Sequence, residues 1–253
     1  MIERVKGQQV VAEGLLLTSF HITTFKDNIL LTNASGFFFQ NNADLFAVTS
    51  RHVVLDEASG HQPDRLAIEL HTDPSNMAQT TSYSIPLYHD GGAAWQQGLD
   101  AAGDVDVAVI EIDQSSLPET ALYQAFSPEH LVDESDDVGI GSTLLIIGFP
   151  LGFHDTLHRM PVARHAIVAS SFGLRFQGEG YFLTDGRTHR GSSGAPIVMR
   201  ATGADAEGKS LPWKLLGVHS ARLDIGTRDS NVDEALGLNC GWYADILLSL
   251  TNP

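Results

Sequence analysis

The feature that most constrains the fold of this 253-residue chain is its succession of short apolar runs, each closed by turn-forming residues. Runs of roughly four to eight residues suit β-strands, whereas helices need longer stretches with helical periodicity. Hydrophobic residues make up 43% of the sequence, enough for a sizeable core, and 24 glycines supply turns. The pattern therefore predicts an all-β protein with strands over residues 9–17, 28–32, 36–40, 45–49, 66–71, 106–112, 143–148, 165–172, 180–184, 195–199, 214–220 and 238–243.

Three segments depart from the strand pattern. Residues 113–141 are rich in Ser, Pro, Glu and Asp, which predicts a crossing between two β-structures with one short helix around 118–131. Residues 90–104 are rich in Gly and Ala and predict a surface loop. Apolar residues recur at helical spacing in 244–250, so a short C-terminal helix is expected there.

The segment 188–196, Thr-His-Arg-Gly-Ser-Ser-Gly-Ala-Pro, carries the chemistry of the chain, because it places Ser193 between two glycines just before an apolar run. Glycine permits backbone angles that other residues resist, so amide N–H groups can converge beside the serine hydroxyl. Converging amides stabilise the oxyanion of acyl transfer. A serine hydroxyl is a weak nucleophile without a base and an orienting acid. The motif therefore predicts a histidine and an aspartate elsewhere in the chain.

Candidates for the base and the acid lie at the ends of predicted strands. A hairpin pattern over residues 36–49 leads directly into His52. Asp106 begins the apolar alternation of 106–112, which leaves its carboxylate at the mouth of the strand. Asp104 is a rival for the same role, two residues earlier. Each motif alone usually has a structural role, so the evidence for a catalytic site is the occurrence of all three in one chain.

In their order of His, then Asp, then Ser, these segments resemble the chymotrypsin-fold (trypsin-like) serine proteases, of the bacterial type that includes Deg proteases and glutamyl endopeptidases. The resemblance implies two antiparallel six-stranded β-barrels with the active site in the cleft between them. Residues 1–120 would form the first barrel and residues 121–253 the second, as one protease unit. The matching blocks lie within roughly residues 34 to 247, at 47–54, 106–109, 148–152, 191–196, 217–221 and 239–244.

The resemblance implies a serine endopeptidase that works through an acyl-enzyme and needs no cofactor. Ser193 would be the nucleophile, and His52 the general base that later protonates the leaving amine. Asp106 would orient the imidazole, with the hydroxyl of Ser220 bonded to its carboxylate. The backbone N–H groups of Gly191 and Ser193 would form the oxyanion hole.

The resemblance also implies a pocket for P1, the residue before the cleaved bond. Arg187 lies six residues before Ser193, where trypsins hold the acid of the pocket floor, so it would repel a basic P1 and attract an acidic one. Thr188 and His219 hold the positions that contact Glu or Gln in glutamyl endopeptidases. Ser220 and Ala221 belong to the strand that pairs with the substrate backbone. Because hydroxyl and imidazole groups can donate to a carboxylate or carboxamide, P1 is predicted to be Glu or Gln, with a small apolar residue left open.

Composition limits which partners and which cellular compartment are expected for this chain. The net charge of −16 repels phosphate backbones, so nucleic acid is not expected as a partner. The single Cys240 forbids an intrachain disulfide, and Leu15–Leu17 is too short an apolar run to cross a membrane. The N-terminus lacks a signal-peptide pattern, which predicts a cytoplasmic protein, although a chain trimmed of its leader would look the same. His154 and His158 are predicted to lie on an exposed loop, and no metal site is expected.

Two other functions remain open beside an active protease with protein or peptide substrates. The first is a catalytically silent module that captures extended peptides by strand addition. The second is a protease that cuts one dedicated protein and stays inactive until a protein partner binds.

Overall fold

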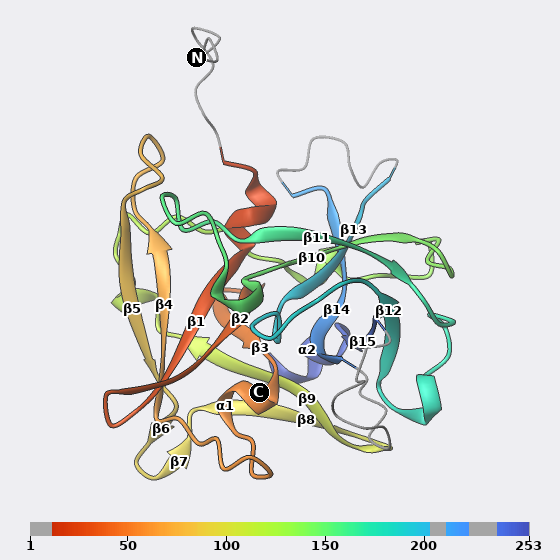
Figure 1. Cartoon of the computed structure of the whole chain (residues 1–253), viewed down its shortest axis with the longest axis horizontal. Coiled ribbons are helices and arrows are strands. Elements are labelled where there is room, and N and C mark those ends of the chain that lie inside the picture. The colour runs from red at the N-terminus through yellow and green to blue at the C-terminus, as the bar shows by residue number, and fades with distance from the viewer. Residues whose placement is uncertain (1–11, 203–210, 223–236, 253) are drawn as a thin grey trace, which may run out of the picture.

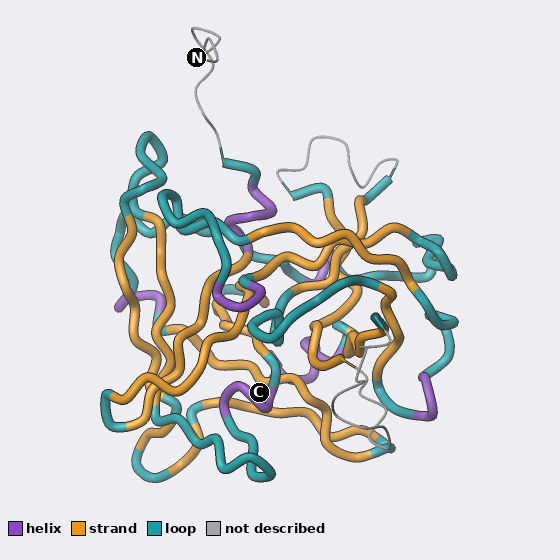
Figure 2. Tube along the Cα trace, in the orientation of Figure 1, coloured by secondary structure: helices purple, strands orange, loops and turns teal. Residues whose placement is uncertain are grey.

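Antiparallel strands form most of the regular structure, in two groups that lie side by side (Figures 1 and 2). The computed structural model describes residues 12–202, 211–222 and 237–252. Helices are confined to short pieces, and among the described residues none is long and apolar enough to span a membrane. The mostly-β, chymotrypsin-like fold predicted from the sequence is confirmed.

The first group is a seven-stranded sheet in the order β5-β4-β1-β2-β3-β9-β8. A small hairpin, β6 and β7, joins the two edge strands β5 and β8, which do not pair with each other. This half therefore differs from the expected closed six-stranded barrel, because its two edge strands are linked by the hairpin and not by hydrogen bonds to each other. The strands are β1 (Ser19–Lys26), β2 (Ile29–Asn41), β3 (Asp44–Thr49), β4 (Arg65–His71), β5 (Thr80–Pro86), β6 (Tyr88–His89), β7 (Gly92–Ala93), β8 (Trp95–Asp100) and β9 (Gly103–Ile112).

Several strands of this sheet were missed or misplaced by the sequence pattern. The expected strand 9–17 is in part the 3-10 helix η1 (Gly14–Thr18), and its first residues lie outside the described ones. β1 and β5 were not predicted, and β8 lies where a loop over 90–104 was expected. β8 is an edge strand with mostly polar or half-exposed residues, so it lacks the apolar signature of a buried strand. The two predicted segments 28–32 and 36–40 form one continuous strand, β2.

The second group is a closed barrel in the order β10-β11-β12-β15-β14-β13, and closure leaves no unpaired edge. Its predicted strands are present, although the one expected over 165–172 begins and ends earlier. The C-terminal helix α2 (Ile246–Leu250) is also present. The strands are β10 (Thr143–Gly148), β11 (Val162–Val168), β12 (Tyr181–Asp185), β13 (Pro196–Arg200), β14 (Trp213–Arg222) and β15 (Leu238–Tyr243).

The crossing between the two groups is extended rather than helical. Of the helix expected around 118–131, only the 3-10 turn η3 (Pro128–His130) exists. Upstream of it, Phe126 exchanges backbone hydrogen bonds with β2, donating to Phe38 O at 3.0 Å and accepting from Gln40 N at 2.7 Å. The crossing therefore satisfies its backbone against the sheet instead of within a helix. The other short helices are α1 (Arg51–Val54), η2 (Gln114–Ser116), η4 (Pro150–Gly152) and η5 (Phe176–Gly178).

One apolar cluster spans both groups of strands. It joins Phe37 and Val48 of the sheet to Val198 and Leu215 of the barrel, and all four side chains are buried. Two further clusters fill the interiors of the sheet and of the barrel separately. Burial of this shared surface holds the two halves together, and the catalytic candidates lie along the line where they meet.

Candidate active site

His52 lies where the end of a strand passes into a single helical turn. β3 ends at Thr49, and α1 begins two residues later, with the buried Val53 and Val54 anchoring the turn. Ser50, between the two elements, donates from Oγ to the carbonyl of His219 at 3.1 Å. This bond ties the turn that carries His52 to β14 of the barrel.

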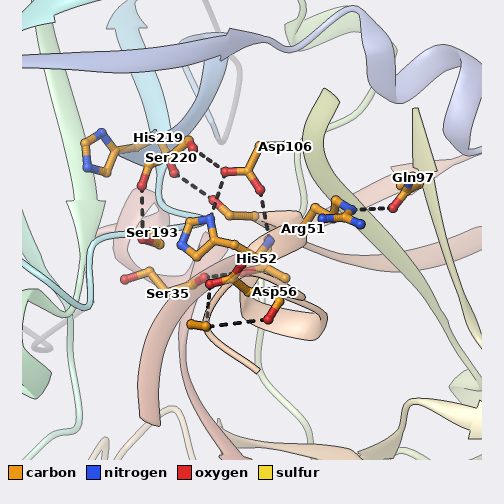
Figure 3. A network of polar contacts seen from close by, with 12 residues as sticks. Ser35, Arg51, His52, Asp56, Gln97, Asp106, Ser193, His219 and Ser220 are labelled. Carbon is orange, nitrogen blue, oxygen red and sulfur yellow. Dashed lines mark hydrogen bonds and ion pairs between the residues drawn. The ribbon is translucent and has the colours of Figure 1, made fainter. Parts of the chain in front are cut away.

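Asp106 reaches His52 because of the strand register. β3 pairs with β9 so that Thr49 lies opposite Ala108, and two further steps place Asp106 beside the start of α1. The carboxylate of Asp106 accepts from the backbone N–H of His52 at 2.9 Å and lies 2.8 Å from its Nδ1. The hydroxyl of Ser220 also donates to this carboxylate (Figure 3). Three donors therefore fix the carboxylate and present the imidazole with Nε2 directed away from it.

The rival acid does not reach His52. Asp104 is exposed, and its Oδ1 accepts from Nε2 of Gln97 at 3.4 Å. Among the described residues, no hydrogen bond joins Asp104 to the imidazole that Asp106 contacts. Of the two candidates, the structure brings Asp106 and not Asp104 to His52.

The surroundings of His52 favour its protonated form. Burial opposes a charge on the imidazole, but the hydrogen bond to Asp106 and the charges of Asp106 and Asp56 outweigh it, so the pKa of His52 is raised above its ordinary value. A raised pKa means that the neutral, proton-accepting form gains population at higher pH than for a free histidine.

Replacing Asp56 should lower this pKa. We expect Asp56→Asn to remove one of the charges that stabilise the imidazolium, so the NMR titration of the His52 ring should move to lower pH. Asp73, which lies on the β4–β5 loop and is half-buried like Asp56, offers a matched control, since Asp73→Asn should leave the titration in place. An unmoved His52 titration in Asp56→Asn would show that the raised pKa comes from Asp106 alone.

Ser193 lies near His52 and Asp106 but is not hydrogen-bonded to either of them. Its Oγ donates to the carbonyl of Ser220 at 3.0 Å, and no bond to His52 forms among the described residues. Ser193 and His52 nevertheless line the same cavity of about 410 Å³. Serine has three staggered rotamers, so rotation about one side-chain bond redirects the hydroxyl without moving the backbone.

The turn before Ser193 leaves two amides available. Gly191 has φ 90°, and a Cβ there would lie 2.6 Å from Phe149 O, so only glycine fits. The neighbouring carbonyls are engaged, Arg190 O accepting from Leu151 N at 2.5 Å and Gly191 O accepting from Oγ of Ser35. Within the described part of the chain, the N–H groups of Gly191 and Ser193 donate to no protein group. Both N–H groups are therefore available to an acceptor on a ligand.

Ser35 on β2 holds this turn from the opposite half of the protein. Its N–H donates to the carbonyl of Ser193 at 2.9 Å, and its Oγ donates to Gly191 O at 2.7 Å while accepting from Phe149 N at 2.9 Å. The carbonyl of Ser35 accepts from Oγ of Thr49 at 2.8 Å. Ser35 was not predicted as a site residue. β2 also carries Thr32, Asn33 and Gln40, so no pattern in the sequence distinguishes Ser35 from them.

Thr188 and His219, the residues predicted to contact the P1 side chain, are both buried. Oγ1 of Thr188 donates to Oδ1 of Asn239, whose Nδ2 donates to Gly186 O at 2.8 Å. Nδ1 of His219 has no partner in the described residues, and its ring points away from Asp106 (Figure 3). Burial, with a smaller contribution from the charge of His52, lowers the pKa of His219 to about 4, so this imidazole is neutral at pH 7.

Arg187 does not lie where the sequence predicted. Gly186 and Thr188 are buried while Arg187 between them is exposed, because successive side chains of an extended segment point to opposite sides. Its carbonyl accepts from the guanidinium of Arg164 at 2.7 Å, which holds the segment in this orientation. The expectation of a cation at the pocket floor is therefore wrong.

Two remaining site predictions lie on β14, and a second residue of the site was missed. Ser220 is buried and bonded to Asp106, as expected. Ala221 belongs to the same strand, but its side chain lies outside the described residues. Asn239, fully buried on β15, was not predicted as a site residue. A polar residue in an apolar strand was the signal, since buried amides must find partners.

The sequence profile of the trypsin-like peptidase domain matches residues 34–204, more than half of the chain. The chain belongs to this family. The match begins just before Ser35 and includes His52, Asp106 and Ser193.

Comparison with solved structures agrees with the fold of a trypsin-like peptidase. The crystal structure of the serine endoprotease from Yersinia pestis superposes with a TM-score of 0.53 at 15% sequence identity. The alignment covers 93% of this chain and 62% of that chain, so the peptidase spans less than two thirds of the length of this structural neighbour. No match was found among curated proteins.

The two histidines on the loop after η4 each contact a nearby oxygen atom. Nδ1 of His154 lies 2.6 Å from Gly152 O, and Nδ1 of His158 lies 2.6 Å from Asp155. Among the described residues, no group of three or more His, Cys, Asp or Glu side chains is placed to hold a metal ion. Residues 155–157 are exposed, so this stretch of the predicted loop does lie at the surface.

Proposed function

We propose that the protein is a serine endopeptidase with His52, Asp106 and Ser193 as its catalytic triad. The observation that carries this proposal is the pair of contacts between the Asp106 carboxylate and His52: it accepts a hydrogen bond from the backbone N–H and lies within hydrogen-bond distance of Nδ1. The amides of Gly191 and Ser193, which have no acceptor within the described residues, support it, because a catalytically inactive relative would have no use for unpaired amides there.

The proposed reaction begins when the hydroxyl of Ser193 turns from the carbonyl of Ser220 toward Nε2 of His52. Oγ attacks the substrate carbonyl as its proton passes to Nε2, and Asp106 stabilises the resulting imidazolium. The amides of Gly191 and Ser193 bind the developing oxyanion. The imidazolium then protonates the leaving amine, and water, activated by the neutral imidazole, hydrolyses the acyl-enzyme.

A fluorophosphonate probe tests this assignment directly, because it bonds covalently only to an activated serine. We expect the native protein to be labelled at Ser193, as located by mass spectrometry of the labelled peptide. Denatured protein and the Ser193→Ala variant should remain unlabelled. Absence of labelling in the folded wild-type protein would overturn the proposal.

We propose further that P1 is a glutamine or glutamate, with a small apolar residue as the alternative. The hydroxyl of Thr188 already donates to Asn239, whereas Nδ1 of His219 has no partner among the described residues and could donate to a P1 side chain. A neutral imidazole N–H can donate to a carboxamide or a carboxylate, and a buried donor left unpaired disfavours other substrates.

A peptide library that varies P1 tests this proposal. We expect Gln and Glu to exceed Ala, and His219→Phe, which keeps a ring but removes the donor, to lower the Gln-to-Ala ratio of kcat/KM roughly tenfold or more. Arg187→Ala is the matched control, because its exposed side chain should not affect the ratio. A profile dominated by Lys or Arg would contradict the proposal.

A protease held inactive until a partner binds is the second candidate, and one observation favours it. Ser193 is bonded to Ser220 and not to His52. If this arrangement persists, the probe labels slowly without a partner and faster with one. Rapid labelling of the isolated protein would exclude this candidate.

A further inference from the structure

β5 is an edge strand of the seven-stranded sheet, and one side of it has no partner strand. It pairs with β4 on one side, and no described strand pairs with the other (Figure 1). Edge strands commonly carry charged side chains or a proline that prevents pairing with another chain. Residues 80–85, Thr-Thr-Ser-Tyr-Ser-Ile, contain neither, and most of them have high β-propensity. The free side of β5 is therefore open to a further strand.

The pairing of β5 with β4 shows which of its backbone groups face the free side. By the strand register, Thr72 lies opposite Gln79, and its N–H donates to the carbonyl of Gln79 at 3.1 Å. At the other end of the pair, Leu87 lies opposite Asp64 and donates to its carbonyl at 2.9 Å. Hydrogen-bonded pairs alternate along an antiparallel ladder, so the odd-numbered residues of β5 direct their backbone groups at β4. The even-numbered residues therefore direct theirs at the free side.

These outward-facing residues offer backbone groups without a partner strand. Ser82 and Ser84 each present an N–H and a C=O, and both residues are exposed. Pro86 presents only a C=O, and proline suits such a position because its missing N–H is not needed for pairing with β4. The stretch from Ser82 to Pro86 spans about 13 Å, since a strand rises about 3.3 Å per residue. An added strand of about four or five residues would pair with it.

A cavity of about 710 Å³ lies beside the free side of β5. Its lining joins Ser84 and Ile85 of β5 to Ile110 and Glu111 of β9, although these two strands do not pair. The cavity exists because β8 begins opposite Ile110, so the last two residues of β9 have no partner on that side. Ile85 and Ile110 are buried and belong to the apolar cluster inside the sheet. The wall of the cavity therefore includes the edge of the core.

The charges around the cavity favour a basic occupant. Glu111 and Asp113 line it and are exposed, and no lysine or arginine is among its described lining residues. Because side chains of a strand alternate between two faces, an added strand would turn one set toward the core and the other toward solvent, beside these carboxylates. A second copy of this chain fits poorly, because it carries the same carboxylates and a net charge of −16.

We propose that the free side of β5 binds a partner protein through an extended segment of alternating apolar and basic residues, which adds to the sheet as a further strand. Backbone pairing with Ser82 and Ser84 supplies affinity, and apolar side chains cover the edge of the core. Basic side chains lie beside Glu111 and Asp113. This cavity shares no lining residue with the cavity of His52 and Ser193, so binding here does not depend on the proposed catalytic triad.

Fluorescence anisotropy with a synthetic peptide tests the proposal. The probe is fluorescently labelled Lys-Val-Lys-Ile-Lys-Val-Lys, and the protein is the full chain with Ser193→Ala, so that the peptide is not cleaved. A second peptide has the same residues with every backbone nitrogen methylated, which keeps the charge but blocks backbone pairing. We expect the methylated peptide to bind at least roughly tenfold more weakly, because it loses its hydrogen bonds to β5. Equal binding of the two peptides would mean that charge alone attracts them and would overturn the proposal.

Two pairs of variants locate the binding on β5. Ser84→Pro removes an outward N–H and should lower the affinity roughly tenfold, whereas Ser84→Ala keeps this N–H and should leave the affinity unchanged. Glu111→Gln removes one charge beside the cavity and should lower the affinity about threefold. Glu134→Gln is its matched control, because Glu134 is exposed and does not line the cavity. Thermal unfolding shows whether each variant is folded.

The methylated peptide and Glu111→Gln leave the backbone of β5 unchanged, so the test does not depend on the folding of Ser84→Pro. An affinity that neither Ser84→Pro nor Glu111→Gln lowers would overturn the proposal. A concentration-dependent dimer that Ser84→Pro dissolves, together with equal binding of the two peptides, would assign the free side of β5 to a second copy and would also overturn it.

Discussion

Ser193→Ala should lower the kcat/KM for peptide hydrolysis about a million-fold, because it removes the hydroxyl that the proposed mechanism uses as its nucleophile. The amides of residues 191 and 193 would remain in place and still polarise the substrate carbonyl, so some catalysis above the uncatalysed rate should survive. The measurement is hydrolysis of a fluorogenic peptide by purified protein. Ser84→Ala, an exposed substitution on the distant edge strand β5, is the matched control and should retain full activity.

Retained activity in Ser193→Ala would remove this residue from the nucleophile role. Contaminating protease must then be ruled out, which labelling with the fluorophosphonate probe accomplishes, since the variant itself should not react. A loss of activity in both serine variants would instead indicate damage to the fold, which thermal unfolding would reveal.

Asp106→Asn should lower kcat/KM roughly ten-thousand-fold. An amide in place of the carboxylate removes the charge that stabilises the imidazolium of His52, and its NH₂ group can force the wrong tautomer on Nδ1. The expected signature is a large fall in kcat with little change in the unfolding temperature. Fluorogenic hydrolysis and thermal unfolding, measured on the same preparation, separate these effects.

Asp104→Asn is the matched control for this substitution. It makes the same chemical change two residues away on β9, on an exposed side chain that does not contact His52. We expect its kcat/KM to stay within a few-fold of wild type. Equal losses in the two variants would mean that the general acidity of the cleft, rather than a specific contact, supports catalysis.

The residues of the proposed catalytic triad could be selected from the sequence because each lies in a short motif with a local physical cause. Gly191 must be glycine to avoid Phe149 O, His52 follows a strand end, and Asp106 starts an apolar alternation. The tertiary contacts were not predictable in the same way. The role of Ser35 depends on segments more than 100 residues apart in the chain, and no local pattern reports such a contact.

The errors in the sequence analysis share a cause. Arg187 was placed in the pocket by counting back from Ser193, but the alternation of an extended segment turned it outward. β8 and β1 were missed because their polar and half-buried residues give a weak apolar signal. Neither residue spacing from a motif nor hydrophobic pattern predicts the orientation of a side chain when that orientation depends on neighbours in space.

The bonds that Ser35 makes have a consequence for how activity depends on stability. The turn that carries Ser193 belongs to one half of the molecule, yet two of the hydrogen bonds that shape it are donated by Ser35, on a strand of the other half. Separately produced halves could each keep a packed interior and still be inert. The free energy of association between the halves therefore sets the fraction of molecules that are competent to react. A substitution at the interface between the halves can abolish activity without unfolding either half.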